Sequence, residues 1–219
     1  MDKVAEYWTN FVLGKNHAVP NVSLFRLFGS LIDTFKDKKI LEIGFLHGAD
    51  LLECKKRGAN VYGIDINPIA VSKIEQKKEV KVKLSRCGVD PIPFDVSFEL
   101  IYMRDTIYYL KDKEIEFFFS DATKKIDFNG LIVIQFIEKD IYVKKQHPME
   151  EFDFNRLSNA KLEPIFEKEN PIRFFSSKEL IIKAEKAGLK LFATKRMLQS
   201  YDLDEERFRL DRYLVFKKK

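Results

Sequence analysis

The pattern that most constrains the fold of this chain is a short apolar run, a glycine, a helix and a second apolar run that ends in an acid. Ile40–Ile43 is followed by Gly44, and Ala49–Arg57 has the spacing of a helix. Val61–Ile64 then leads to Asp65. Short apolar runs that alternate with helices are typical of parallel strands joined by crossover helices. We therefore expect a parallel sheet with helices on both faces.

The same alternation continues to the end of the chain. We expect further helices at Val4–Leu13, Val22–Phe35, 68–79, Lys113–Ile126 and Ser177–Ala187, and further strands at Val80–Leu84, Phe98–Met103, Leu131–Ile137, Leu189–Arg196 and Arg212–Phe216. Asn21 or Ser23 would start the second helix, and Asn129-Gly130 is a turn signal. The last two strands are close enough in sequence to pair antiparallel. The prediction is an α/β, doubly wound, seven-stranded sheet whose last strand is antiparallel.

One segment interrupts this alternation. Glu138–Phe175 is polar, contains several prolines and has no clean period. We predict that 138–175 is an insertion that lies over the carboxyl edge of the sheet and covers an acceptor. The 219 residues then divide into leading helices at 1–37, which would cover the site, and one sheet domain at 38–219.

Composition excludes several classes of protein. The balance of 39 basic against 34 acidic residues, a formal net charge of +5, permits an anionic partner without requiring one. The longest apolar run, Leu131–Ile137, is interrupted by Gln135 and falls well short of the roughly 20 residues that cross a bilayer. Cys54 and Cys87 lie in unrelated contexts, which fits a reducing cytoplasm. No His, Cys or carboxylate spacing predicts a metal site.

The glycine loop and the acid after it predict a nucleoside-containing ligand. Gly44 permits a tight turn, and Gly48 permits a close approach of the backbone. In doubly wound folds an acid in the position of Asp65 accepts hydrogen bonds from ribose hydroxyls. Glu42 precedes the glycine, where a carboxylate suits a cationic ligand and would repel a pyrophosphate.

These motifs resemble those of the class I S-adenosylmethionine-dependent methyltransferases. Leu41–Gly44 resembles the first motif of that superfamily, and Val61–Asn67 is similar to the second. Phe98–Ile101 is similar to the fourth strand, and the ending Leu189–Phe216 to the antiparallel close of the fold. Phe174–Leu189 resembles an element of the members that act on small molecules.

The resemblance implies S-adenosylmethionine as cofactor and S-adenosylhomocysteine as product. It places Asp65 at the ribose, Ile66 against the adenine, and Cys87 and Gly88 near the adenine. The full set of implied cofactor-binding residues is Glu42, Gly44, Phe45, His47, Gly48, Asp65, Ile66, Cys87, Gly88 and Arg104. The chain departs from the usual loop at Leu46, which stands in place of the middle glycine of a Gly-x-Gly-x-Gly pattern.

The methyl acceptor is predicted by what the sequence lacks and by its N-terminal segment. Arg104–Tyr109 lacks the Asp/Asn-Pro-Pro-aromatic motif of enzymes that methylate exocyclic amines of nucleobases, and no cysteine follows a proline. Nucleic acid is therefore disfavoured as substrate. Glu6–Phe25 looks like the leading helices of bacterial small-molecule methyltransferases, several of which belong to capsule or other surface-glycan pathways. We expect transfer to an O or N atom of a small polar metabolite, such as a sugar, nucleotide-linked or phosphorylated precursor.

Three side chains are candidates for a general base, and three for acceptor contacts. Histidine titrates near neutrality, and acidic groups after the fourth strand often face the acceptor. The candidate bases are Asp105, His17 and His147, and the candidate acceptor contacts are Tyr7, Tyr108 and Arg173.

Two other functions remain open at this stage. One is an NAD-dependent oxidoreductase, which shares the glycine loop and the ribose acid. The other is a non-catalytic module that binds a protein partner, or RNA through the basic residues in 73–86. The sequence is compatible with a monomer or a homodimer.

Overall fold

The computed structural model describes most of the sheet domain. The described residues are Ala5, Trp8, Thr9, Val12, Leu13, 19–77, 79–137, 175–202 and 207–219. The predicted insertion lies outside these residues apart from Phe175, and so do the sequence candidates Tyr7, His17, His147 and Arg173.

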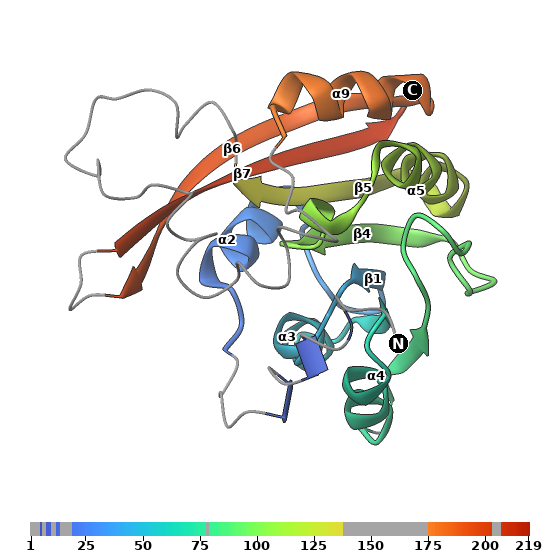
Figure 1. Cartoon of the computed structure of the whole chain (residues 1–219), viewed down its shortest axis with the longest axis vertical. Coiled ribbons are helices and arrows are strands. Elements are labelled where there is room, and N and C mark those ends of the chain that lie inside the picture. The colour runs from blue at the N-terminus through green and yellow to red at the C-terminus, as the bar shows by residue number, and fades with distance from the viewer. Residues whose placement is uncertain are drawn as a thin grey trace.

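Among the described residues, seven strands form one sheet in the order β3-β2-β1-β4-β5-β7-β6 (Figure 1). The strands are β1 Lys39–Ile43, β2 Asn60–Asp65, β3 Lys81–Leu84, β4 Phe98–Arg104, β5 Ile126–Ile137, β6 Leu189–Asp202 and β7 Arg207–Lys218. β1 to β5 pair in parallel, and β7 is antiparallel to both β5 and β6. The predicted doubly wound sheet with an antiparallel last strand is confirmed. The strand order reverses between β1 and β4, which is where such sheets bind ligands.

Helices cover both faces of the sheet because successive residues of its central strands, which point to opposite faces, are apolar. The helices are α2 Val22–Leu31, α3 Ala49–Lys56, α4 Pro68–Glu75, α5 Asp112–Lys125 and α9 Ser177–Lys186, with a 3₁₀ turn at Ile107–Tyr109. α5 and α9 pack against one face through Phe118, Phe119 and Leu180. α2, α3 and α4 pack against the other, as Figure 1 shows, through residues that include Phe28 and Leu51.

Side-chain caps explain where three of these helices begin. The Asn21 Oδ1 accepts a hydrogen bond from the Leu24 N–H at 2.9 Å, and the Ser176 hydroxyl accepts one from the Glu179 N–H at 3.2 Å. Asn67 caps α4, whose first residue is Pro68. Each cap satisfies an N–H that has no partner inside its helix.

The structure differs from the sequence predictions at several boundaries. α2 ends at Leu31, four residues before the predicted end at Phe35. The turn predicted at Asn129-Gly130 is wrong, because β5 already begins at Ile126 and includes both residues. The pairing register of β5 with β4 shifts between Phe98 and Leu100. Such an irregularity accommodates extra residues without ending the strand.

The β6–β7 hairpin is also longer than predicted. β5 pairs with β7 only up to Asp211, whereas the pairing of β6 with β7 continues to Arg207. The tip of the hairpin therefore projects past the rest of the sheet as a two-stranded ribbon (Figure 1). None of the described helices has the length and apolarity to cross a membrane.

Phe28 joins α2 to the centre of the sheet, so its truncation tests the packing of that face. The Phe28 ring is fully buried and meets the Tyr102 ring edge-on with centroids 5.2 Å apart. We expect Phe28→Ala to lower the free energy of unfolding by about 3–5 kcal/mol in urea titrations. The control Phe128→Ala, at a ring that is 78% exposed, should change it by less than about 0.5 kcal/mol. Equal effects of the two substitutions would contradict this packing.

Candidate functional site

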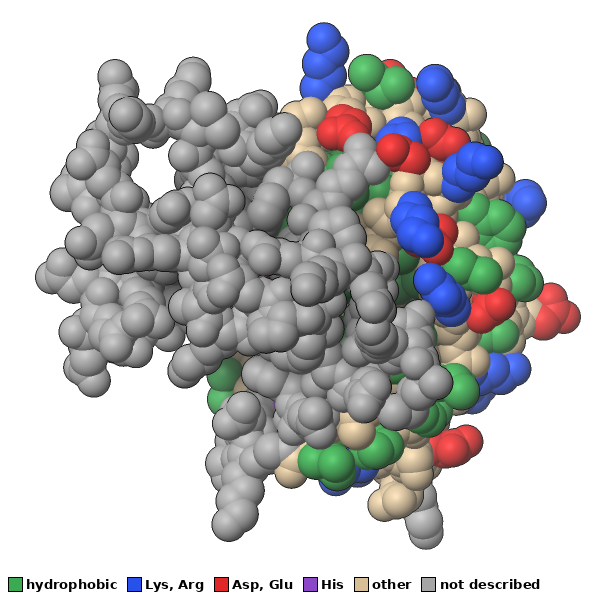
Figure 2. Space-filling view, viewed as in Figure 1, with side chains coloured by type: hydrophobic (Ala, Val, Ile, Leu, Met, Phe, Trp, Pro, Cys, Tyr) green, Lys and Arg blue, Asp and Glu red, His purple; other side chains and the backbone are tan. Residues whose placement is uncertain are grey.

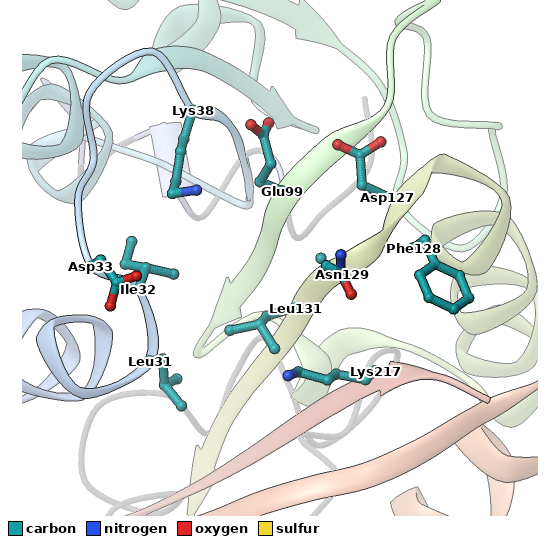
Figure 3. A pocket seen from close by; sticks show the side chains of 11 residues that line it. Leu31, Ile32, Asp33, Lys38, Glu99, Asp127, Phe128, Asn129, Leu131 and Lys217 are labelled. Atoms are coloured by element: carbon teal, nitrogen blue, oxygen red, sulfur yellow. The ribbon is translucent and has the colours of Figure 1, made fainter.

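Within the described part of the chain, cavities open at opposite edges of the sheet. A cavity of about 500 Å³ lies at the amino edge, beside the starts of β4 and β5 (Figure 3). Its polar lining includes Lys38, Glu99, Asp127 and Lys217. A cavity of about 380 Å³ lies at the carboxyl ends of β1, β2 and β4. Because parallel sheets bind ligands at the carboxyl ends of their strands, the carboxyl-edge cavity is the candidate site.

The structure brings most of the sequence candidates that it describes to the carboxyl-edge cavity. The candidates that line it are Gly44, Phe45, His47, Asp65, Ile66, Cys87, Arg104 and Asp105. Glu42, Gly48, Gly88 and Tyr108 are not part of this lining, although Tyr109, the neighbour of Tyr108, is. The lining also contains Trp8 and Leu46, and Ser85 and Thr106, which the sequence analysis did not single out.

The two loop glycines are required by backbone conformation and by space. Gly44 has φ +74° and Gly48 has φ +68°, a region that side chains rarely adopt. A Cβ at Gly44 would overlap the Thr106 hydroxyl. A Cβ at Gly48 would lie 2.6 Å from the Ile74 side chain. The loop therefore packs tightly against β4 on one side and α4 on the other.

Leu46 adopts the same left-handed region without being glycine. Its φ is +44°, which costs a residue with a side chain on the order of 1–2 kcal/mol. The Leu46 N–H donates to Asp65 Oδ2 at 2.8 Å. This hydrogen bond from the end of β2 offsets part of the cost and holds the loop open beside the cavity.

Both carboxylate oxygens of Asp65 accept backbone N–H groups. Its Oδ1 accepts the Asn67 N–H at 2.8 Å, while Oδ2 accepts that of Leu46. Burial raises the pKa of Asp65, and these backbone donors act in the opposite direction. Since each carboxylate oxygen can accept more than one hydrogen bond, Asp65 keeps capacity for ligand hydroxyls.

A second group of charges lies at the end of β4. The Arg104 Nε lies 2.7 Å from Asp50 Oδ2, and Arg104 Nη1 lies 3.8 Å from Asp105 Oδ2. Asp50 Oδ1 also accepts the Asn21 N–H at 2.7 Å. Arg104 and Asp105 line the cavity, whereas the Asp50 side chain is completely buried in the first turn of α3.

Glu42 lies behind this group, inside the sheet domain. Its carboxylate accepts the Tyr102 hydroxyl at 2.8 Å and is almost fully buried. Burial raises the pKa of Glu42 well above its ordinary value, and the negative charge of Asp50 raises it further. Glu42 is not part of the cavity lining, and the charged groups that act on it include Asp50 and Arg104.

Gln135 positions Asp105. In the sequence, this glutamine stood out only as an interruption of an apolar run. Gln135 is fully buried in β5, and its Oε1 accepts the Asp105 N–H at 2.9 Å. Asp105 has φ +54°, so this bond fixes a backbone conformation that aspartate seldom adopts. A polar side chain within a buried strand needs a hydrogen-bond partner. The position of Gln135 in the apolar run was therefore the signal from which a contact of this kind could have been predicted.

The two ends of the cavity differ in chemistry because different strands supply them. β2 and β3 bring Asp65, Ile66 and Cys87 to one end. β1 and β4 bring the glycine loop and the Arg104–Asp105 pair to the other. Burial raises the pKa of the Cys87 thiol, so it stays neutral beside apolar neighbours. Burial lowers the pKa of His47, and Lys73 lowers it further.

Comparison with known proteins identifies the family of this domain. The chain matches a family model described as a methyltransferase domain over residues 21–194. A search of curated protein sequences finds no match. Among solved structures, the chain is similar to a TehB-like SAM-dependent methyltransferase from Corynebacterium glutamicum, with 19% identity, a TM-score of 0.63, and 100% of this chain and 97% of that one covered.

Two further structures are similar at low identity. Magnesium protoporphyrin IX methyltransferase from Synechocystis, with bound SAM, has 13% identity and a TM-score of 0.66 over 100% of this chain and 98% of that one. The glycopeptide N-methyltransferase MtfA, complexed with S-adenosylhomocysteine, has 8% identity and a TM-score of 0.65 over 95% and 91%. These likenesses show the fold. The family model spans the glycine loop, Asp65 and the end of β4, and the chain belongs to the methyltransferase domain family.

Proposed function

We propose that the carboxyl-edge cavity binds S-adenosylmethionine and that the chain transfers its methyl group to an O or N atom of a small polar metabolite. The observation that carries the proposal is Asp65, a buried carboxylate that lines the cavity and also holds the glycine loop. Family membership supports the reaction type. S-adenosylmethionine would supply a methyl group on a positively charged sulfur.

The residues of the cavity fit that cofactor. Asp65 offers acceptors for ribose hydroxyls, and Ile66 offers an apolar surface for the adenine. At the other end, Asp50 and Asp105 face a single guanidinium, that of Arg104. An excess of carboxylates favours a cation, as the sulfonium requires. The guanidinium of Arg104 has five donors, which leaves some for the carboxylate of the methionine end.

Asp105 is the proposed base for the acceptor. It directly follows β4 and is one of the residues that line the cavity. A base assists when the acceptor is a hydroxyl or a protonated amine, and positioning supplies much of the remaining rate. The other candidate bases and acceptor contacts, His17, His147, Tyr7 and Arg173, lie outside the described residues.

The acceptor proposal is a sugar, nucleotide-linked or phosphorylated precursor of a bacterial surface glycan, methylated in the cytoplasm. It is supported by the likeness of the N-terminal segment to bacterial small-molecule methyltransferases and by the missing nucleobase motifs after β4. The insertion at 138–175 is the proposed acceptor lid, and the leading residues in 1–37 are the proposed cover of the cofactor.

The structure does not favour an RNA-binding module. The Lys73 Nζ donates to the Val12 carbonyl at 2.8 Å, and the Lys83 Nζ donates to the Pro93 carbonyl at 2.8 Å. Arg86 pairs with Glu114 at 3.5 Å. Figure 2 shows basic and acidic side chains interspersed over the described part of the face in view. An NAD-dependent oxidoreductase is not favoured either, because the matching family is a methyltransferase family.

Removal of the Asp65 carboxylate tests the proposed cofactor. We expect Asp65→Ala to weaken S-adenosylhomocysteine binding at least about tenfold in calorimetry, since charge-assisted hydrogen bonds are lost. Asp65→Asn should also weaken it, because its NH2 group would face the backbone N–H of Leu46 or of Asn67 and cannot accept a hydrogen bond from it. The control Asp95→Ala changes an exposed aspartate and should leave the Kd unchanged. Absence of binding by the unsubstituted protein at millimolar ligand would refute the cofactor.

Replacement of Glu42 tests whether its carboxyl is buried as the structure shows. Because the folded-state pKa of Glu42 is raised, the protein loses stability as the pH rises above the unfolded-state pKa of about 4.3. Glu42→Gln keeps an acceptor for the Tyr102 hydroxyl and carries no charge. We expect the unfolding free energy of the variant, relative to wild type, to increase as the pH rises from about 4.5 to about 8. A difference independent of pH would show that Glu42 reaches water.

A further inference from the structure

The buried side chain of Asn67 connects the ribose acid to the start of α4. Its Oδ1 accepts the N–H groups of Ile69 at 2.9 Å and Ala70 at 3.0 Å, which caps the helix. The backbone N–H of Asn67 donates to Asp65 Oδ1 at 2.8 Å. These bonds fix the orientation of the amide, because only the oxygen can accept from the helix. The Nδ2 group therefore points away from α4.

That Nδ2 group binds the N-terminal segment. It donates to the Ala5 carbonyl and to the Thr9 hydroxyl, both at 3.0 Å. The Thr9 hydroxyl in turn donates to the Ala5 carbonyl at 2.8 Å. One turn further along α4, the Lys73 Nζ donates to the Val12 carbonyl at 2.8 Å. We name the described residues Ala5, Trp8, Thr9, Val12 and Leu13 the N-terminal cover.

The N-terminal cover reaches across the cavity to the β4 side. Trp8 lines the cavity, and its ring meets that of Tyr109 edge-on, with centroids 6.1 Å apart and planes at 85°. Tyr109 belongs to the 3₁₀ turn that follows β4 and also lines the cavity. The cover is thus bonded to α4 at one side and touches an aromatic wall at the other.

We propose that Asn67 is a positioning residue that holds the N-terminal cover closed over the cofactor and slows cofactor release. The proposal rests on the proposed function. An aspartate would cap α4 as well as an asparagine does, since both are favoured N-cap residues. The two donors of Nδ2 are what an aspartate lacks, and among the described residues both donate to the cover.

Asn67→Asp separates the two roles of this side chain. It keeps the cap and the backbone bond to Asp65, but it places a carboxylate oxygen against the Ala5 carbonyl. Thr9→Val removes the hydroxyl that accepts a hydrogen bond from Asn67 Nδ2, without a change of charge. Asn129→Asp is the matched control, because Asn129 is exposed at the amino-edge cavity. S-adenosylhomocysteine is the probe, since it lacks the sulfonium charge to which a new carboxylate would respond.

Trp8 is the single tryptophan of the chain, so its fluorescence reports on the N-terminal cover without a label. We expect S-adenosylhomocysteine to leave Asn67→Asp about tenfold faster than wild type in stopped-flow fluorescence, as expected for the loss of about 1.4 kcal/mol. Thr9→Val should accelerate release in the same direction, and Asn129→Asp should not. In the free protein, acrylamide should quench Trp8 more strongly in Asn67→Asp and Thr9→Val than in wild type.

The two readouts distinguish failure of this proposal from failure of the proposed function. If wild type does not bind S-adenosylhomocysteine, the proposed cofactor is wrong, and acrylamide quenching still decides whether Asn67 holds the cover. If quenching and release in both variants equal those of wild type, Asn67 serves only as a helix cap and the proposal is overturned.

Discussion

The site depends on one carboxylate that accepts two backbone N–H groups. Asp65 binds the glycine loop through Leu46 and the entry to α4 through Asn67. The first bond keeps a leucine in a left-handed conformation that normally calls for glycine. The second places Asn67 where its side chain can cap α4 and bind the N-terminal cover. The loop, the helix and the cover are therefore all positioned from the end of β2.

The opposite end of the cavity is organised by buried charge. Arg104 lies between Asp50 and Asp105, and Asp50 also fixes the start of α2 through the Asn21 N–H. Isolated buried charges are costly, so this arrangement is stable only because each carboxylate has a donor. The buried Glu42 likewise has a donor, the Tyr102 hydroxyl. Charge and loop geometry together define a site at the carboxyl ends of β1, β2 and β4.

The sequence predicted the parts of this site that depend on backbone requirements. Gly44 and Asp65 could be recognised because a tight turn and a strand-end acid recur at fixed places in such sheets. The turn expected at Asn129-Gly130 failed because a register shift lets β5 run through it. Contacts between distant side chains could not be predicted, since they depend on the tertiary fold. Gln135 meets Asp105 because β5 pairs with β4, and Trp8 meets Tyr109 because the N-terminal segment packs beside the turn after β4. Glu42 was assigned to the ligand from its motif, whereas in the structure it is buried and is not part of the cavity lining.

A crystal structure with bound S-adenosylhomocysteine would test the central claim most directly. We predict the ribose hydroxyls within hydrogen-bond distance of the Asp65 carboxylate, the adenine against Ile66, and the sulfur at the end of the cavity formed by Gly44 and Asp105. Ligand density in the amino-edge cavity, or a ribose that does not contact Asp65, would contradict the account.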